Sequence, residues 1–431
     1  MKKVTKKIVS MMMAFTVLGS LAACGSGNTE ASNSADNTAL LNQIGALETQ
    51  ITDIQEELGG QIAVLQNALD GYMAEDAEDA SGLASNYGAE AYEMVKYIDA
   101  VGKDRDAIAG DKYKFIQKWI KWNLISAGYV EGEDVVDHNF TWSKYYKKET
   151  NLEETITASK YTTDGKLYKR VGRKYEESED GTHVKADITG TNIVVTKKGK
   201  TDKQIIVGAH YDGAGTGDNG SGISLGLITA MNLFKVETEY TVKFVFFDAE
   251  EYGLYGSTAY ANDMTEEEIN NTLYMINMDS LVCGDYCYLY GGVEDPEAKT
   301  VTQTGAYENA MAVAESLGLT FKSNPWTYEN PTPGFETPLY AAPSTGDWSD
   351  HVGFKSVGIP YVYFEATNWE IPGPYKEYDG YGETYLVGML MNTPNDYLEY
   401  IESYFPGRIL SHLTQFSTLL NALVTQSDVT L

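Results

Sequence analysis

The chain has 431 residues, of which 62 are Asp or Glu and 32 are Lys or Arg, so its formal net charge at pH 7 is −30. This excess of acid excludes a protein that binds nucleic acid through a basic face, because attraction to phosphate requires Lys and Arg. A hydrophobic content of 43% is sufficient for a packed globular protein. The length allows one large domain or up to three smaller ones.

The first 23 residues have the layout of a secretory signal. Four lysines precede an apolar run over residues 8–21, which is too short to span a bilayer. The run ends in small residues directly before Cys24, and this resembles the lipobox of bacterial lipoproteins, in which the cysteine is lipidated. An ordinary cleaved signal with a coincidental cysteine is the alternative. Removal of residues 1–23 takes away four lysines and no acid, which changes the net charge from −30 to −34. We expect the mature protein to lie outside the cytoplasmic membrane and to be tethered to it by a lipid.

Two segments separate this leader from the main domain. Residues 24–38 are small and polar, which is typical of a flexible spacer. Residues 39–85 comprise a helical segment with its linker, and over 39–73 apolar residues recur every seven positions. This heptad pattern predicts a coiled-coil-like helix that would allow a homo-oligomer to form through 39–73. The alternative is a helix that folds back on the main domain or binds an accessory subunit.

Residues 86–431 are long enough for one α/β domain with a buried core. Apolar residues at helical spacing predict helices within 86–127, whereas the polar segment 128–185 has no clear pattern. Beyond it, short apolar runs alternate with helical patterns. This alternation predicts a sheet that is largely parallel at its centre, with helices on both faces. The expected strands are 192–196, 204–209, 241–247 and 272–278, and the expected helices are 222–234, 298–317 and much of 395–425.

Acidic residues and a histidine follow three of these strands. Strand 204–209 is followed by His210 and Asp212, strand 241–247 by Asp248, Glu250 and Glu251, and strand 272–278 by Asp279. Ligands in open α/β sheets bind at the carboxyl ends of the strands, so these side chains are expected at one edge of the sheet. Histidine and carboxylates that converge without thiols suit zinc or a similar divalent metal.

Two other motifs in the same stretch point elsewhere and are rejected. Gly215, Gly217 and Gly220 match a dinucleotide-binding fingerprint, but Asp218 would put a carboxylate where the pyrophosphate must lie. Residues 222–226 match GxSxG, but Ser224 is expected inside a helix, whereas a nucleophilic serine requires the sharp turn between strand and helix. The sequence contains no HExxH, which excludes a helix-borne zincin site.

The cysteines do not form a scaffold or a zinc-binding pair. With Cys24 assigned to the leader, Cys283 and Cys287 remain, and they lie in an apolar stretch. We expect both to be small core residues, and a local disulfide is the alternative.

Five motifs along the chain resemble the metal-site motifs of metallopeptidase family 28, which includes the bacterial leucyl and broad-specificity di-zinc aminopeptidases. They are GAHYDG at 208–213, GDNGSG at 217–222, DAEEYGLYGS at 248–257, NMDS at 277–280 and SDH at 349–351. The resemblance covers residues 95–425. It implies the family's zinc exopeptidase fold, which is a mixed, mainly parallel twisted sheet with helices on both faces.

The resemblance also implies two zinc ions per chain. His210 and Asp279 would hold one ion, and Glu251 and His351 would hold the other. Asp218 would bridge the two, since a carboxylate has two oxygens and paired metals share an anion.

Two further carboxylates have implied roles around these ligands. Asp212 would orient the His210 imidazole. Glu250 would be the general base that takes a proton from the attacking water and later passes it to the leaving amine. Asp350 is expected to support His351 in a comparable way, with a helix N-cap as the alternative.

We therefore expect a zinc-dependent aminopeptidase that hydrolyses N-terminal residues from peptides. The alternatives are a carboxypeptidase or another amide hydrolase of the same fold, or a non-catalytic lipoprotein that binds peptides. The loop between His210 and Asp218 is shorter than in many members of the family, and no residue is assigned to stabilise the oxyanion. Four aromatic residues are expected to wall the substrate pocket or to pack in the core: Trp326, Tyr328, Tyr340 and Trp348.

Overall fold

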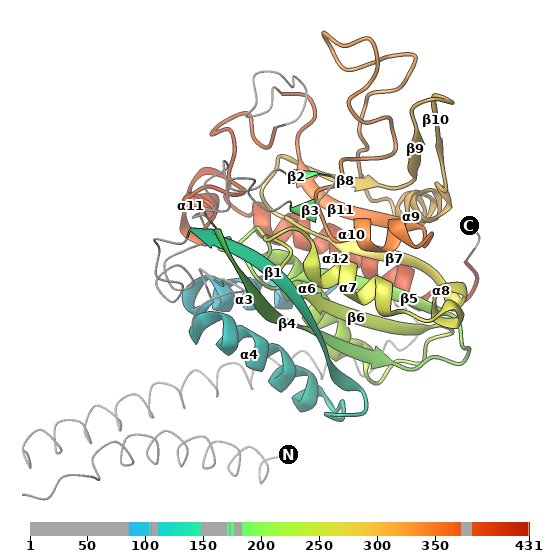
Figure 1. Cartoon of the computed structure of the whole chain (residues 1–431). Coiled ribbons are helices and arrows are strands. Elements are labelled where there is room, and N and C mark those ends of the chain that lie inside the picture. Colours follow the sequence, from blue (N-terminus) through green and yellow to red (C-terminus); the bar gives the residue numbers. More distant parts are fainter. Residues whose placement is uncertain are drawn as a thin grey trace, which may run out of the picture. The chain divides into compact units, whose positions relative to one another are not determined.

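The computed structural model describes most of the chain from residue 86 onward (Figure 1). The described residues are 86–102, 105, 111–147, 170–171, 174–175, 183–371, 382–429 and 431. They belong to one compact unit, Gly82–Leu431. The predicted signal 1–23, the spacer 24–38 and the segment 39–85 lie outside the described residues and stay predictions. Within the described part, no helix is both long enough and apolar enough to cross a membrane.

A seven-stranded mixed sheet with the strand order β1-β4-β6-β5-β7-β11-β8 is the centre of this unit. The four central strands run parallel, whereas β1 and β4 at one edge and β8 at the other are antiparallel to their neighbours. Two small hairpins, β2–β3 and β9–β10, lie outside the sheet. The strands of the sheet are β1 (Val135–Lys147), β4 (His183–Lys197), β5 (Gln204–His210), β6 (Thr241–Phe247), β7 (Thr272–Met278), β8 (Tyr286–Tyr290) and β11 (Tyr361–Thr367); those of the hairpins are β2 (Arg170–Val171), β3 (Lys174–Tyr175), β9 (Val293–Asp295) and β10 (Thr300–Thr302).

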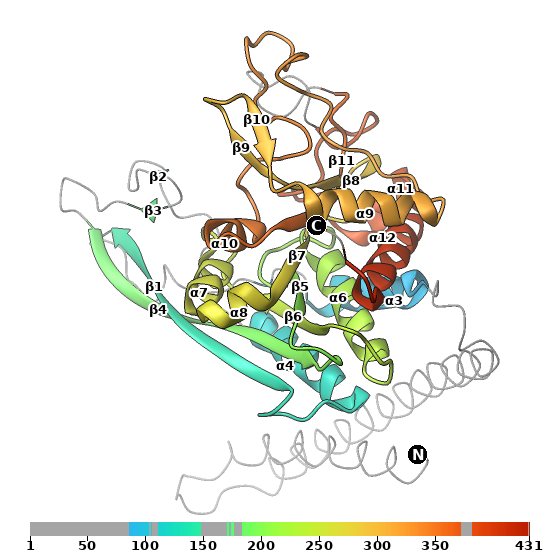
Figure 2. The ribbon, with the colours of Figure 1, turned by 90° about the vertical axis from the view of Figure 1, so that its right-hand side faces the viewer.

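Both faces of the sheet are covered by helices, as Figure 2 shows from the side. On one face, the helices share a core cluster with alternate strand residues such as Ile205 and Val207. On the other face, helices pack with the residues between them, such as Ile206. Successive side chains of a strand point to opposite faces, so a strand that is covered on both sides reads as a continuous apolar run. The first face carries α3 (Gly88–Val101), α4 (Asp111–Ala127), α6 (Gly220–Leu233), α9 (Gly305–Ser316), α11 (Leu398–Tyr404) and α12 (Arg408–Thr425), and the second carries α7 (Tyr255–Asp263), α8 (Glu266–Asn271) and α10 (His351–Ser356).

The predicted fold class is confirmed, and so are the four predicted strands and the helix at 222–234, which α6 contains from Gly220 onward. The helix predicted at 298–317 is wrong in its first part, because Thr300–Thr302 pair with β9 and α9 begins only at Gly305. The helix predicted over 395–425 is two helices. Pro406 and Gly407 separate them, and Gly407 adopts a φ of 78°, which favours glycine.

Two features of the core complete the comparison with the predicted elements. The polar segment 128–185, which has no clear sequence pattern, contains the thirteen-residue edge strand β1. Cys283 and Cys287 are buried free thiols in the core. The interpretation of these cysteines as core residues is therefore confirmed, and the disulfide alternative is wrong.

Candidate metal centre

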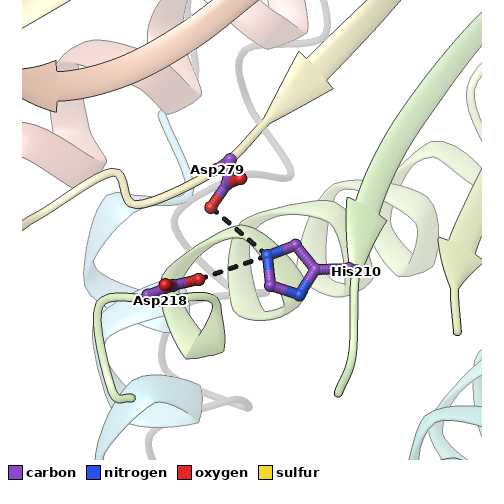
Figure 3. Close-up of side chains that lie close together, drawn as sticks. All are labelled: His210, Asp218 and Asp279. Atoms are coloured by element: carbon purple, nitrogen blue, oxygen red, sulfur yellow. Dashed lines mark hydrogen bonds and ion pairs between the residues drawn. The ribbon is translucent and has the colours of Figure 1, made fainter. Parts of the chain in front are cut away.

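The site lies where three neighbouring parallel strands end at the same edge of the sheet. His210 is the last residue of β5, and Asp279 follows β7 directly. Asp218 comes from the loop between β5 and the start of α6. Figure 3 shows the two carboxylates directed toward the same imidazole nitrogen. All three residues are buried, with at most 6% of the surface of each residue exposed.

Nε2 of His210 is the point on which the two carboxylates converge. It lies 3.2 Å from Oδ1 of Asp218 and 3.3 Å from Oδ1 of Asp279. The three ligand atoms lie within 4.8 Å of one another, and this is the one group of its kind among the residues that the structure describes. Burial by itself lowers the pKa of His210, but the Asp279 and Glu250 carboxylates outweigh it and raise that pKa well above its ordinary value.

Asp212 connects the histidine to the segment that carries the glutamates. Its Oδ1 lies 3.5 Å from Nδ1 of His210, on the opposite side of the ring from the other carboxylates. Its two oxygens also accept the backbone N–H groups of Glu250 and Glu251, each at 3.2 Å. Asp212 is completely buried. It is therefore placed to fix both the imidazole and the start of the loop after β6, of which the sequence predicted the first.

Glu250 faces the same centre. Its Oε2 lies 4.0 Å from Nε2 of His210, and its side chain is 10% exposed. Burial and the Asp279 and Asp350 carboxylates raise the pKa of Glu250 well above its ordinary value, against the opposing effect of His210. The preceding Ala249 has a φ of 55°. A carboxylate with a raised pKa, adjacent to a metal-type cluster, suits a general base.

Glu251 and His351, the predicted ligands of a second ion, lie outside the three-residue group. Glu251 is exposed at the surface of the loop after β6. His351 is buried at the first position of α10, where its ring stacks on Tyr363 with 5.1 Å between ring centroids. Their assignment stays a prediction.

Asp350 occupies the N-cap position of α10, as the alternative prediction had it, but its side chain makes no capping hydrogen bond. The side chain is completely buried, and burial raises its pKa to about 7.

Three polar residues that the sequence did not assign support Asp279. Ser349 donates a hydrogen bond to Oδ2 of Asp279 at 2.7 Å and accepts one from the Asn277 amide at 2.8 Å. Ser280 donates to Oδ1 at 3.2 Å. Although burial raises the pKa of Asp279, His210 and these two hydroxyls lower it below its ordinary value. Ser349, Asn277 and Ser280 all lie within the quoted motifs, so the motif boundaries contained a signal for them.

Asp396 and Arg105 support the loop that carries Asp218, and no sequence signal identified either. Asp396 accepts the backbone N–H groups of Gly217 at 2.6 Å and Asp218 at 2.9 Å. The guanidinium of Arg105 donates to the carbonyls of Tyr211 at 3.1 Å and Gly215 at 3.0 Å. Arg105 is completely buried and Asp396 is 3% exposed. This pair holds the loop at both ends and brings opposite charges to it.

The two rejected motifs have structural roles in the same region. Ser224 lies inside α6 and donates its hydroxyl proton to the Gly220 carbonyl at 2.7 Å, which confirms that it is not on a nucleophile turn. Asn219 caps the start of α6 by accepting the N–H of Gly222 at 2.9 Å.

A cavity of about 740 Å³ adjoins the cluster. Glu250 and Glu251 line its side toward the metal-type group. Of the four aromatic residues predicted for a pocket wall, Tyr340 and Trp348 line this cavity, whereas Trp326 packs against the core of the second face. The volume is within the range of about 300–1,000 Å³ that is typical of small-ligand sites.

The donor set fits zinc. One imidazole and two carboxylates supply nitrogen and oxygen ligands, and Asp212 faces the other imidazole nitrogen, which is the usual arrangement behind a metal-bound histidine. No thiol lies in the group. So many carboxylates buried together would repel one another without a cation among them.

The fold and the cluster thus define an α/β protein with a candidate metal centre at the carboxyl edge of its sheet. The model of peptidase family M28 matches residues 192–386. The alkaline phosphatase isozyme conversion protein of Escherichia coli (strain K12) is 30% identical over 248 residues, which cover 52% of this chain and 67% of that protein. The chain belongs to peptidase family M28.

Other relatives carry the name aminopeptidase. Aminopeptidase YwaD of Bacillus subtilis (strain 168) is 30% identical over 249 residues, 54% of this chain, and the match spans only 47% of YwaD. Among solved structures, the aminopeptidase from Aneurinibacillus sp. strain AM-1 superposes with a TM-score of 0.53 at 16% identity, covering 80% of this chain and 95% of its own. A zinc aminopeptidase from Bacillus subtilis gives 0.50 at 18% identity, with 80% and 96% covered. These likenesses confirm the fold.

Proposed function

We propose that this protein is a zinc-dependent aminopeptidase that holds two zinc ions and works outside the cytoplasmic membrane. The observation that carries the proposal is the buried convergence of His210, Asp218 and Asp279 beside Glu250, which itself lines a cavity of about 740 Å³. Membership of a peptidase family and relatives named aminopeptidases support it.

The residues would divide the work as follows. His210 and Asp279 would hold one ion, Glu251 and His351 the other, and Asp218 would contribute an oxygen to each. When bound, zinc supplies a Lewis acid that polarises the scissile carbonyl and makes water more acidic. Asp212 keeps the imidazole oriented through Nδ1 and fixes the backbone of both glutamates.

Glu250 would act as the general base and then as the general acid. Because its pKa is raised, Glu250 accepts a proton more readily than an ordinary carboxylate, as a general base requires. It takes the proton from the attacking water and delivers it to the leaving amine. This requires only that Glu250 face the cavity, and it does.

Selectivity for a free N-terminus follows from charge. The cavity wall nearest the cluster consists of the carboxylates of Glu250 and Glu251. A protonated α-amine is attracted to this wall, whereas an acetylated one brings neither charge nor the same hydrogen bonds. The attraction would place the first peptide carbonyl next to the metal centre.

Metal content and hydrolysis test the proposal together. The panel consists of aminoacyl peptides and their N-acetylated counterparts, with Glu250→Gln as the matched variant. We expect two zinc ions per chain, cleavage of free N-termini only, and a variant that keeps its zinc and loses at least about 100-fold in kcat. Efficient cleavage of the blocked peptides would contradict the aminopeptidase assignment.

The location and the possible partners are proposed from the sequence of residues 1–73. Lipidation of Cys24 would tether the protein to the membrane, and 39–73 would mediate any homo-oligomer. We expect Cys24→Ser to move the protein from the membrane fraction to the soluble extracytoplasmic fraction without loss of activity. A wild-type protein that is soluble in the cytoplasm would overturn this part of the proposal.

A further inference from the structure

The cavity beside the metal centre is lined by more acid than the reaction uses. We propose that it selects peptides whose N-terminal residue carries a cationic side chain, with Glu294 as the specificity-determining carboxylate. The inference rests on the proposed function and names the substrate class of the same site.

The charges on the cavity wall are the first step. Besides Glu250 and Glu251, which face the metal centre, the described lining contains two carboxylates, Glu294 and Asp347, and one ammonium group, Lys355. Lys355 is bound by Asp347 in an ion pair, so these two charges compensate each other. Among the described lining residues, Glu294 is therefore the carboxylate away from the metal centre that no ammonium group balances.

The position of Glu294 is fixed by the cavity wall. Its Oε1 accepts the backbone N–H of Ala341 at 2.5 Å and also the hydroxyl of Ser344. Both donors belong to the segment 339–348, most of which also lines the cavity, so the carboxylate joins strand β9 to that segment. Glu294 is half-buried and held by two donors, so its side chain loses little conformational entropy when it binds a ligand. Its charge is also screened less by solvent than that of an exposed carboxylate.

The remaining wall suits the aliphatic stem of lysine or arginine. Tyr340 and Trp348 both line the cavity, and their rings contact each other edge to face with 5.0 Å between centroids. Long cationic side chains pack their methylene groups along aromatic surfaces and place the charge beyond them. A neutral side chain would fill the space but would bring no opposite charge to the Glu294 carboxylate.

The experiment compares two substrates that differ only in the terminal ammonium group of the side chain. Lysine and norleucine p-nitroanilides have the same stem, and only lysine carries the ammonium group. We expect the zinc-loaded wild-type protein to prefer lysine at least about tenfold in kcat/KM, and Glu294→Gln to bring the ratio close to one by lowering the lysine value. Glutamine keeps an oxygen for the two donors, so the wall should be retained.

Glu297→Gln is the matched control. Glu297 is an exposed acid in the same β9–β10 hairpin and does not line the cavity. The Glu297→Gln substitution removes the same charge from the protein and is expected to leave the ratio of the two kcat/KM values unchanged. A wild-type ratio at or below one, or an equal effect of Glu294→Gln on both substrates, would overturn the inference.

Binding separates this inference from the proposed function. Calorimetric titration of the zinc-loaded protein with lysinamide and norleucinamide measures selectivity without turnover. Preference for lysinamide that depends on Glu294, in a protein that cleaves neither anilide, would uphold the pocket and reject the aminopeptidase. Turnover of both anilides without preference would do the reverse.

Discussion

Asp396→Asn should weaken zinc binding although Asp396 is not a predicted ligand. The carboxylate holds the backbone N–H groups of Gly217 and Asp218 with one oxygen each, at 2.6 and 2.9 Å. Asparagine has a single oxygen, so one N–H would face an amide NH₂ and lose its acceptor. The backbone at Asp218 would then be less firmly fixed, and the Asp218 side chain would no longer be held in one orientation.

The magnitude follows from the contacts. A hydrogen bond to a charged acceptor contributes about 1.5–3 kcal/mol, and Arg105 loses the nearby opposite charge as well, so we expect a loss of about 2–4 kcal/mol in the free energy of unfolding. Loss of a residue that positions a metal ligand typically lowers metal affinity by about 10–100-fold. Burial raises the pKa of Asp396 to about 7, so the comparison belongs at pH 8, where the carboxylate is ionised.

The assay is a zinc titration against a chromophoric chelator, with urea unfolding of the metal-free proteins in parallel. Asp285→Asn is the matched control, because Asp285 also accepts a backbone N–H, that of Tyr385 at 2.8 Å, and also pairs with an arginine, Arg408 at 2.6 Å. We expect Asp285→Asn to lower stability and leave zinc affinity unchanged. Equal zinc affinities of Asp396→Asn and Asp285→Asn would refute the reasoning.

Two further predictions follow from buried groups near the site. Burial raises the pKa of Glu383 from an ordinary 4.5 to about 8, so its carboxyl stays protonated in the folded state over a pH range in which the unfolded chain ionises. The free energy of unfolding should therefore fall as pH rises from about 4.5 to 8, by at most about 5 kcal/mol. Urea unfolding of Glu383→Gln should accordingly show a flatter pH profile than that of the wild type. A steeper pH profile for Glu383→Gln than for the wild type would contradict this prediction. Gly213→Ala should displace Glu251, because a Cβ on Gly213 would lie 2.5 Å from Oε1 of Glu251, and we expect fewer zinc ions per chain by metal analysis. Gly334→Ala is its control, since Gly334 also has a positive φ, costing about 1–2 kcal/mol, but a Cβ there would meet nothing within 4 Å. Equal zinc content in both variants would reject the contact.

The sequence predicted the central sheet and the edge at which the site lies, because both depend on local patterns. A strand that is covered on both faces shows a continuous apolar run, as β5 does from Ile205 to Ala209, and the strand itself places His210 at its end. The edge strand β1 was not predicted, since it packs only residues such as Phe140 and Trp142 while its neighbours Asn139 and Thr141 are exposed. A polar composition of this kind does not distinguish an edge strand from a loop.

The supporting residues escaped prediction for a different reason. Asp396 accepts hydrogen bonds from backbone N–H groups that lie 179 and 178 residues away, and Arg105 donates to backbone carbonyls. Any carboxylate or guanidinium in the correct position could bind backbone groups in this way. Such a contact therefore produces no residue spacing or local composition that could be recognised in the sequence. Ser349, by contrast, lies two residues before the predicted ligand His351 and inside a motif, so the motif contained Ser349, but its hydrogen bond to Asp279 was not predicted.

Removal of the metal is expected to lower the stability of the folded protein more at high pH than at low pH. In the metal-free protein, burial raises the pKa of both Asp350 and Asp396 to about 7, and folding becomes less favourable as pH rises from about 4 to 7 because the unfolded chain ionises first. Metal binding requires deprotonated ligands, so the stabilisation that it contributes increases over the same range. We expect the difference in Tm between zinc-loaded and EDTA-treated protein to widen from pH 5 to pH 8. A Tm difference that is constant or narrows with pH would mean that these buried acids are compensated by the protein alone, and that the centre does not need a cation to fold.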